Sequence, residues 1–209
     1  EDEDFGFHGR IGQTPAEEIC ISREWDEGTP AITISGKTHE GRLFGSSLTL
    51  SREIRVYYGL PYIDISDVIS NDGTKEEPCM LLYHFNLGYP LLDENARLVT
   101  SHTYEKPVDE NARRNENERS SFRAPERNVA ECCYYYQQRE GKEGAFAACV
   151  NERLGLGVAI HTRPEELPLL CQWKSWATGD YVIGIEPSNC YGDGRSKHMQ
   201  RGELEVIPA

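Results

Sequence analysis

Short runs of β-branched and aromatic residues, separated by Gly, Asn, Asp and Pro, recur along this chain of 209 residues. The clearest example is residues 62–70, where apolar and polar side chains alternate. A period of two is the pattern of a strand with one buried and one solvated face. Long amphipathic helical patterns are missing from the sequence. We therefore predict an all-β fold, an antiparallel β-sandwich with few helices.

A chain of this length commonly forms one large β domain, so we predict a single domain over residues 1–209. Residues 79–84 are mostly apolar and predict a buried strand that ends at His84. Between residues 104 and 127 the composition changes to Glu, Asn, Arg and Pro with few aliphatic residues. Such a segment buries little surface, and we predict a surface loop there.

The charge and cysteine content exclude several classes of protein. The formal net charge of −13 disfavours nucleic acids and anionic membranes as partners, because both attract positive surfaces. The sequence has no apolar run long enough to span a membrane. Seven cysteines without a C-x-x-C pair fit neither a zinc ribbon nor a disulfide framework. We predict free thiols and a cytoplasmic location.

Polar residues that could take part in catalysis or binding lie in three segments, residues 7–10, 83–88 and 184–189. His8, beside a glycine near the start, has the ordinary interpretation of an exposed loop residue. His84 could be a hydrogen-bonded histidine at the end of a strand. Glu186 follows the apolar stretch 181–185, where a carboxylate is costly to bury unless it is paired or functional. Glu186 is therefore the strongest candidate for chemistry.

These three segments resemble motifs of one family. The run His84-Phe85-Asn86-Leu87-Gly88 resembles a mutarotase strand in which a histidine precedes Phe-Asn-Leu, and residues 7–10 (Phe-His-Gly-Arg) resemble that family's Leu-His-Gly-Gly segment. Ile185-Glu186-Pro187 is similar to the late strand that bears the catalytic glutamate. The chain thus resembles the aldose 1-epimerase (galactose mutarotase-like) superfamily, and within it a poorly characterised aldose 1-epimerase-like branch.

The resemblance also has two departures. Family members carry additional N-terminal strands, so the chain resembles a C-terminal portion. Arg10 stands where ordinary mutarotases have a second glycine, so a simple galactose enzyme is not implied. The fold that the resemblance implies is the galactose mutarotase-like β-sandwich.

The activity that the resemblance implies is interconversion of sugar anomers by acid/base opening of the hemiacetal ring, with no metal or cofactor. Glu186 would be the base, His84 the acid, and His8 would bind sugar hydroxyls or polarise the ring oxygen. Acid and base would flank a sugar ring about 5 to 9 Å apart. The other expected substrate contacts are Arg10, Asn86, Trp173, Lys174 and Arg195.

Several alternatives stay open at this point. The three cationic contacts indicate either salt bridges to surface carboxylates or an acidic substrate, so the expected ligand is a monosaccharide or a sugar acid. The same sandwich could be a non-catalytic carbohydrate-binding module. It could also be another sugar isomerase or lyase that uses the His/Glu pair, including a metal-dependent one with His8, His84 and Glu186 as ligands. A homodimer is a further expectation.

Overall fold

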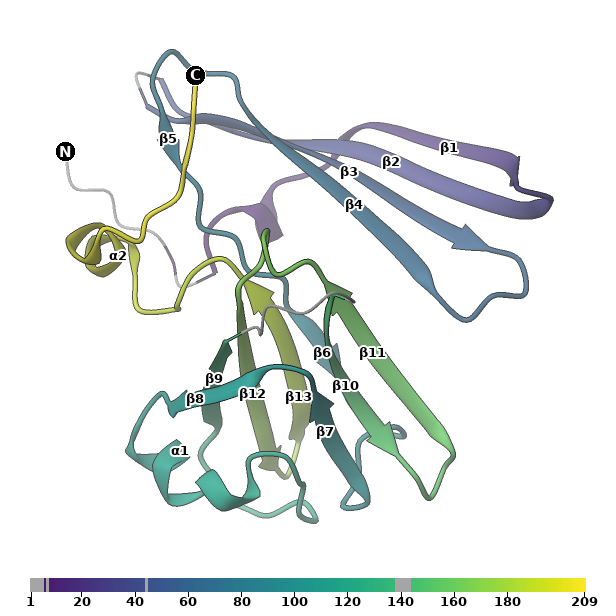
Figure 1. The fold of residues 1–209 in the computed structure, drawn as a ribbon, viewed down its shortest axis with the longest axis vertical. Helices are drawn as coiled ribbons and strands as arrows, with labels where there is room; N and C mark the ends of the chain where they lie inside the picture. The colour runs from purple at the N-terminus through teal and green to yellow at the C-terminus, as the bar shows by residue number, and fades with distance from the viewer. Residues whose placement is uncertain (1–5, 7, 44, 138–143) are drawn as a thin grey trace. The chain divides into compact units, whose positions relative to one another are not determined.

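The structure, a computed structural model, describes residues 6, 8–43, 45–137 and 144–209, so Phe7 of the first motif lies outside the described residues. The sequence predicts one domain, and in the structure the chain forms two compact units (Figure 1). The first unit comprises Glu1–Cys79 and Glu205–Ala209, and the second comprises Met80–Leu204. Each unit is described by itself below.

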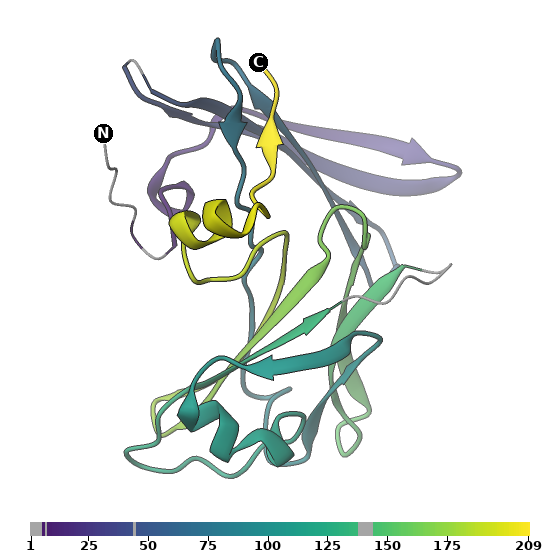
Figure 2. The same ribbon diagram turned by 60° about the vertical axis from the view of Figure 1, so that its left-hand side comes forward.

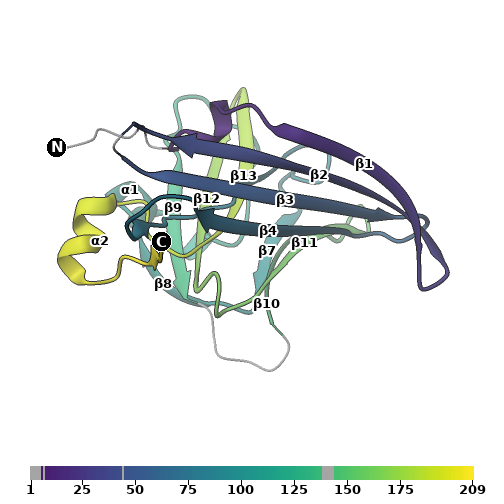
Figure 3. The ribbon, with the colours of Figure 1, turned by 90° about the horizontal axis from the view of Figure 1, so that it is seen from above.

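The first unit is built on a four-stranded antiparallel sheet in the order β1-β2-β3-β4 (Figure 3). Its strands are β1 (Glu17–Asp26), β2 (Thr29–Gly41), β3 (Ser47–Tyr57) and β4 (Ile63–Asn71). The predicted alternating strand at residues 62–70 corresponds to β4. A short 3-10 helix, η1 (Ile11–Gln13), precedes β1, and β5 (Glu77–Pro78) pairs with β14 (Val206–Ile207) near the end of the chain.

The second unit contains two antiparallel sheets. The larger has the strand order β6-β13-β12-β9-β8, with β6 (Phe85–Leu87), β13 (Asp180–Ser188), β12 (Leu169–Ala177), β9 (Cys132–Gln137) and β8 (Thr103–Pro107). The smaller has the order β11-β10-β7, with β11 (Leu156–Thr162), β10 (Ala145–Asn151) and β7 (Ala96–Thr100). Two short helices, α1 (Glu110–Arg114) and α2 (Arg195–Arg201), and one 3-10 turn, η2 (Glu116–Glu118), complete this unit.

A single apolar core joins the two sheets of the second unit. It combines side chains of the larger sheet, such as Tyr134, Leu170 and Ile183, with Leu98 and Cys149 of the smaller one. Burial of one face of each sheet against the other is the defining feature of a sandwich. The predicted all-β, antiparallel sandwich class is therefore confirmed. No described helix is long and apolar enough to cross a membrane.

The strand predicted at residues 79–84 does not form. Pro78 ends the short strand β5, and the boundary between the two units follows Cys79. Beyond it the backbone is held by single contacts: the amide of Leu81 donates to the side-chain oxygen of Asn189, and that of Tyr83 to the carbonyl of Pro187. A regular strand begins only at Phe85.

Residues 104–127 also differ from the predicted surface loop. The segment contains most of β8, all of α1 and η2, and two buried residues, Ala112 and Phe122. Helix α1 lies beside β8 and β9 (Figure 2). The Asp109 side chain accepts a hydrogen bond from the amide of Ala112 and caps this helix. Capping and the burial of Phe122 order a segment whose composition alone predicts none.

Candidate active site

The imidazole of His84 and the carboxylate of Glu186 lie next to each other in the second unit, with Nε2 of His84 3.0 Å from Oε1 of Glu186. Glu186 belongs to β13, and His84 immediately precedes β6, the strand that pairs with β13. The antiparallel register ends with Phe85 opposite Ile185. One position further, His84 and Glu186 therefore lie opposite each other, with their side chains on the same face of the sheet. Strand pairing therefore brings the two groups together.

Two rows of side chains cross this face of the larger sheet. In the first row Glu186 stands between His84 and Cys171, its direct partner on β12. In the second row Gly184 stands between Asn86 on β6 and Trp173 on β12. Since side chains alternate along a strand, both rows point to the face opposite the core residues Ile183 and Ile185.

The separation of His84 and Glu186 is shorter than the predicted 5 to 9 Å, which placed a sugar ring between the two groups. The predicted spacing is wrong because the two residues occupy neighbouring positions on paired strands rather than opposite walls of a cavity. Side by side, an acid and a base can still reach two oxygens bonded to one carbon, provided that both oxygens approach from the same edge.

Burial dominates the electrostatics of Glu186, which is only 5% exposed. Burial disfavours the charged form and is the main reason that the pKa of this carboxyl rises from its usual 4.5 to about 7. The Cys171 thiol hydrogen-bonds the carboxylate and lowers the pKa, while the charge of Glu131 raises it. A carboxyl with a pKa near 7 gains and loses its proton readily at neutral pH, as a general acid or base must.

Gly184 leaves the space that the carboxylate occupies. A Cβ built at this position would overlap Oε1 of Glu186, and it would lie 3.3 Å from Cε1 of His84. Any residue other than glycine would therefore shift the Glu186 carboxylate from this position. The glycine allows the carboxylate to lie beside His84 in the observed arrangement.

Trp173 borders the pair with a fixed orientation. Its ring lies edge-on to the His84 ring, with centroids 5.9 Å apart, and its indole N–H donates to Oε2 of Glu131 at 2.7 Å. The indole is half-buried, so part of it faces solvent. An oriented aromatic ring of this kind offers an apolar surface to a ligand held beside it.

The structure does not place Lys174 in this site. Lys174 follows Trp173 along β12, points to the core face and is fully buried. Its Nζ donates to the carbonyl oxygens of Glu118 at 2.5 Å and Ser121 at 3.0 Å. Three aromatic rings surround the ammonium group, those of Phe122, Tyr134 and Trp176. Lys174 therefore anchors the segment after α1 from inside the core, and the expectation of a substrate contact is wrong on geometric grounds.

The remaining predicted residues are distributed over both units. Asn86 lies in the second row of the site and is exposed. Arg195 is the first residue of α2 in the second unit and is half-buried. His8 and Arg10 precede η1 in the first unit, where His8 is exposed and Arg10 half-buried. The roles of these four residues stay predictions.

Three residues of the site were not predicted from the sequence: Glu131, Cys171 and Gly184. The alternation of β12 contains a signal for one of them, since Cys171 and Trp173 are two positions apart and share a face. The other two depend on strand pairing, because Glu131 reaches the site through Trp173 and Gly184 through its cross-strand neighbours.

Comparisons with known proteins agree with this fold. A family described as "Domain of unknown function (DUF4432)" matches residues 1–209. The chain belongs to the DUF4432 family. No curated protein matches its sequence.

Two solved structures are similar to this DUF4432 chain. The first is described as a "putative aldose 1-epimerase" from Klebsiella pneumoniae, with a TM-score of 0.90 and 25% sequence identity over 96% of this chain and 53% of the other. The second is a galactose mutarotase-like protein from Clostridium acetobutylicum, with a TM-score of 0.65 and 13% identity over 96% of this chain and 64% of the other. The resemblance to the aldose 1-epimerase superfamily is thus confirmed, and the chain spans about half the length of the Klebsiella protein.

Proposed function

We propose that this DUF4432 chain carries the acid/base centre of an aldose 1-epimerase-like isomerase that interconverts the anomers of a monosaccharide or sugar acid. The observation that carries the proposal is the 3.0 Å approach of the His84 imidazole to the Glu186 carboxylate on the face of the larger sheet that is opposite the core. Membership of a superfamily that includes aldose 1-epimerase-like proteins supports the same reaction. A raised pKa at Glu186 fits a group that must exchange a proton near pH 7.

In the proposed cycle, Glu186 takes the proton of the anomeric hydroxyl while His84, as imidazolium, gives a proton to the ring oxygen. The bond between the anomeric carbon and the ring oxygen breaks, and an aldehyde and a free hydroxyl form. Rotation about the next carbon–carbon bond presents the other face of the aldehyde. Ring closure then returns one proton to His84 and takes one from Glu186, so that both groups recover their starting states.

The electrostatics of Glu186 are compatible with its role as the base. Burial raises the pKa of this carboxyl to about 7, so that the carboxylate and the protonated form are both accessible near neutral pH. Trp173 and Asn86 would contact the sugar from the second row, and His8, Arg10 and Arg195 are the further contacts that the superfamily resemblance implies.

The test is the rate of anomeric exchange, followed by NMR for a panel of neutral and acidic monosaccharides. Glu186→Gln and His84→Asn should each lower the rate with the preferred sugar by about 100-fold to 10,000-fold, because each removes one proton-transfer group. Glu152→Gln is the matched control, since Glu152 is an exposed carboxylate paired with Arg97 on the smaller sheet. Its exchange rate should equal that of the wild type.

Two results would overturn the proposal. A wild-type protein that binds a sugar by saturation-transfer NMR without accelerating its anomeric exchange would be a carbohydrate-binding module. Exchange that is fast in the wild type and unchanged in Glu186→Gln would place the chemistry at other residues.

A further inference from the structure

The indole of Trp173 is held by a chain of hydrogen bonds that begins at the short helix α1. The Trp173 N–H donates to Oε2 of Glu131 at 2.7 Å, and the ring lies edge-on to that of His84. Glu131 is exposed and directly precedes strand β9. An exposed carboxylate orients an indole only if the backbone that carries the carboxylate is itself fixed. Whatever fixes Glu131 therefore determines where the indole lies.

The side chain of Asn111 fixes the backbone at Glu131. Its amide nitrogen donates to the carbonyl oxygen of Glu131 at 2.8 Å and to that of Ala130 at 3.3 Å. The same nitrogen lies 3.3 Å from Sγ of Cys132, the first residue of β9. One half-buried side chain thus contacts three consecutive residues at the point where β9 begins.

Helix α1 in turn gives Asn111 a fixed position. Asn111 is the second residue of this helix, which Asp109 caps by accepting a hydrogen bond from the amide of Ala112. Ala112 is fully buried, and α1 contacts both β8 and β9. A helix of five residues depends on such contacts for its stability. The chain of contacts therefore starts from the packed part of the second unit.

An asparagine that donates to backbone carbonyls often has a purely structural role. Asn115, in the same segment, is an example, because among the described residues its side chain bonds only to Asn111 and Arg123. Asn111 differs from Asn115 in what it holds. The residue that it fixes, Glu131, carries the carboxylate that orients Trp173.

We propose that Asn111 and Glu131 are positioning residues of the active site: Asn111 holds the backbone at Glu131, and Glu131 holds the Trp173 ring beside His84. The ring then offers its apolar face to the C–H groups of the sugar in one orientation. This role towards a sugar rests on the proposed function, whereas the chain of hydrogen bonds can be tested without any activity. The connection between β8 and β9 is accordingly part of the support of the site.

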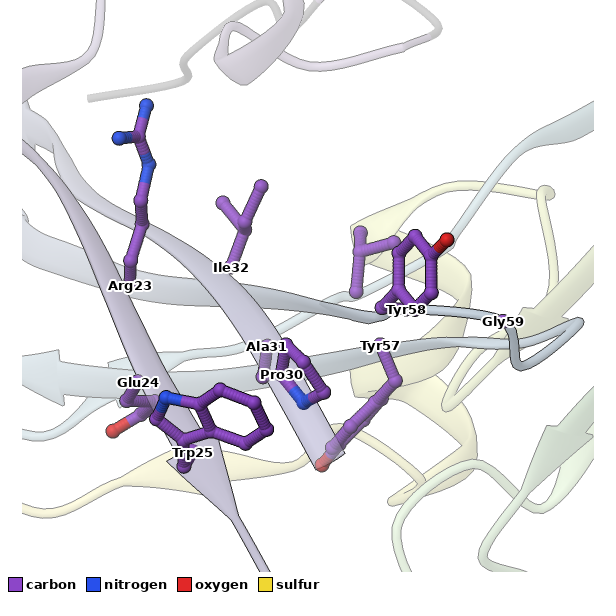
Figure 4. Close-up of a pocket in the computed structure, with 10 residues that line it drawn as sticks. Arg23, Glu24, Trp25, Pro30, Ala31, Ile32, Tyr57, Tyr58 and Gly59 are labelled. Atoms are coloured by element: carbon purple, nitrogen blue, oxygen red, sulfur yellow. The ribbon is translucent and has the colours of Figure 1, made fainter. Parts of the chain in front are cut away.

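The first measurement follows the indole N–H signals of an isotope-labelled chain by NMR, with Trp173→Phe to assign the signal of Trp173. The chain has three tryptophans, so two of them serve as internal references. Trp176 is buried in the core of the second unit. Trp25, which lines a pocket of the first unit (Figure 4), is 75% exposed. Because its N–H is hydrogen-bonded, Trp173 should exchange its indole proton with water more slowly than Trp25.

Asn111→Ala should accelerate this exchange at Trp173 by at least about fivefold and leave the other two indoles unchanged, because it frees only the backbone at the start of β9. Glu131→Ala should have at least the same effect. Glu131→Gln should stay close to the wild type, since a glutamine oxygen can accept the same hydrogen bond. Asn115→Ala is the matched control and should leave the Trp173 signal in place. Circular dichroism confirms the fold of each variant.

The second measurement is the rate of anomeric exchange with the preferred sugar. Asn111→Ala and Glu131→Ala should each lower kcat/KM by about tenfold, and Asn115→Ala should keep it within about twofold of the wild type. Most of the loss should appear as a higher KM, because the indole contacts the sugar in the ground state as well as in the transition state.

An unchanged Trp173 signal in a folded Asn111→Ala variant would overturn the role of Asn111, and an unchanged signal in Glu131→Ala would overturn that of Glu131. Equal acceleration at Trp176, or an equal effect of Asn115→Ala, would show general loosening and would also overturn the proposal. If Asn111→Ala does not fold, Glu131→Ala decides, because its exposed side chain can be removed without a cavity in the core. A wild type without anomeric exchange would refute the proposed function and leave the indole measurement valid.

Discussion

Gly184 and Glu186 are two residues apart on β13, and the carboxylate of Glu186 occupies the space into which a Cβ at Gly184 would project. The backbone of one residue thus determines where the acid/base carboxyl of the other can lie. The ring of His84 borders the same space, since a Cβ at Gly184 would lie 3.3 Å from its Cε1. The glycine consequently serves the arrangement of His84 and Glu186. The strand itself does not need a glycine here, because Gly184 does not have a positive φ.

Gly184→Ala should therefore lower the rate of anomeric exchange by at least about tenfold while the fold is retained, because a displacement of the base of about 1 Å has effects of this order or larger. The measurement is the exchange rate together with circular dichroism. Gly88→Ala is the control, since its Cβ would meet only the carbonyl oxygen of Tyr181 at 3.6 Å. Equal rates in the two variants would contradict the requirement.

Cys171 provides a second prediction, on the pH dependence of the reaction. Its thiol hydrogen-bonds the Glu186 carboxylate and lowers the pKa of that group. Cys171→Ala removes this bond, so the carboxyl should ionise at higher pH, and the acidic limb of the rate profile should move up by about one pH unit, because a hydrogen bond to a charge contributes about 1.5 kcal/mol.

Cys171→Ser keeps a donor at the same place, so its profile should stay near that of the wild type. Direct titration of the Glu186 carboxyl by carbon NMR separates this effect from catalysis. An unchanged Glu186 titration in Cys171→Ala would show that the thiol does not position or tune the carboxylate, whatever the protein's activity.

The fold class and the pair could be predicted from the sequence, but their surroundings could not. Alternation of apolar and polar residues identified β4, and an expensive carboxylate after an apolar run singled out Glu186. Lys174 was misassigned because the sequence does not say which face of a central strand is catalytic and which is core. In β12 both faces are largely buried, so a lysine beside a tryptophan gives no sign of its direction.

The composition of residues 104–127 likewise did not predict that this segment is structured. A polar segment becomes structured here through two distant partners, the core that receives Phe122 and the ammonium of Lys174 that holds two of its carbonyl groups. Such long-range partners exist only after the sheet has formed. The predicted distance between His84 and Glu186 was wrong for the same reason, because the distance is fixed by the register between two paired strands.

Glu186 should also reduce the stability of the folded protein at neutral and alkaline pH. Its pKa is about 7 in the folded state against about 4.5 in an unfolded chain, so the folded state binds a proton more tightly between these values. Stability from this group is therefore complete below about pH 4.5 and is lost as the pH rises through 7. The loss is about 3 kcal/mol at most.

Glu186→Gln removes this titration, and the variant should unfold at higher urea concentration than the wild type at pH 8, with a much smaller difference at pH 5. The exposed control Glu152→Gln should show no such gain. A variant that is less stable than the wild type at pH 8 would mean that the contact with His84 outweighs the cost of burying the charge.

Lys174 supports the last prediction, which separates structure from catalysis. Burial lowers the pKa of this ammonium group to about 8, and the folded state therefore binds its proton less tightly than an unfolded chain does. Stability should rise as the pH increases from about 8 to 10.5, because the unfolded state holds more protons in that window. Lys174→Met removes this rise and leaves the carbonyls of Glu118 and Ser121 without their donor, which costs about 1 to 3 kcal/mol for each buried group. Hydrogen exchange should accelerate in residues 116–123, whereas the pH profile of anomeric exchange should keep its shape, because Lys174 lies on the core face and does not touch Glu186. A displaced acidic limb in Lys174→Met would instead return this lysine to the active site.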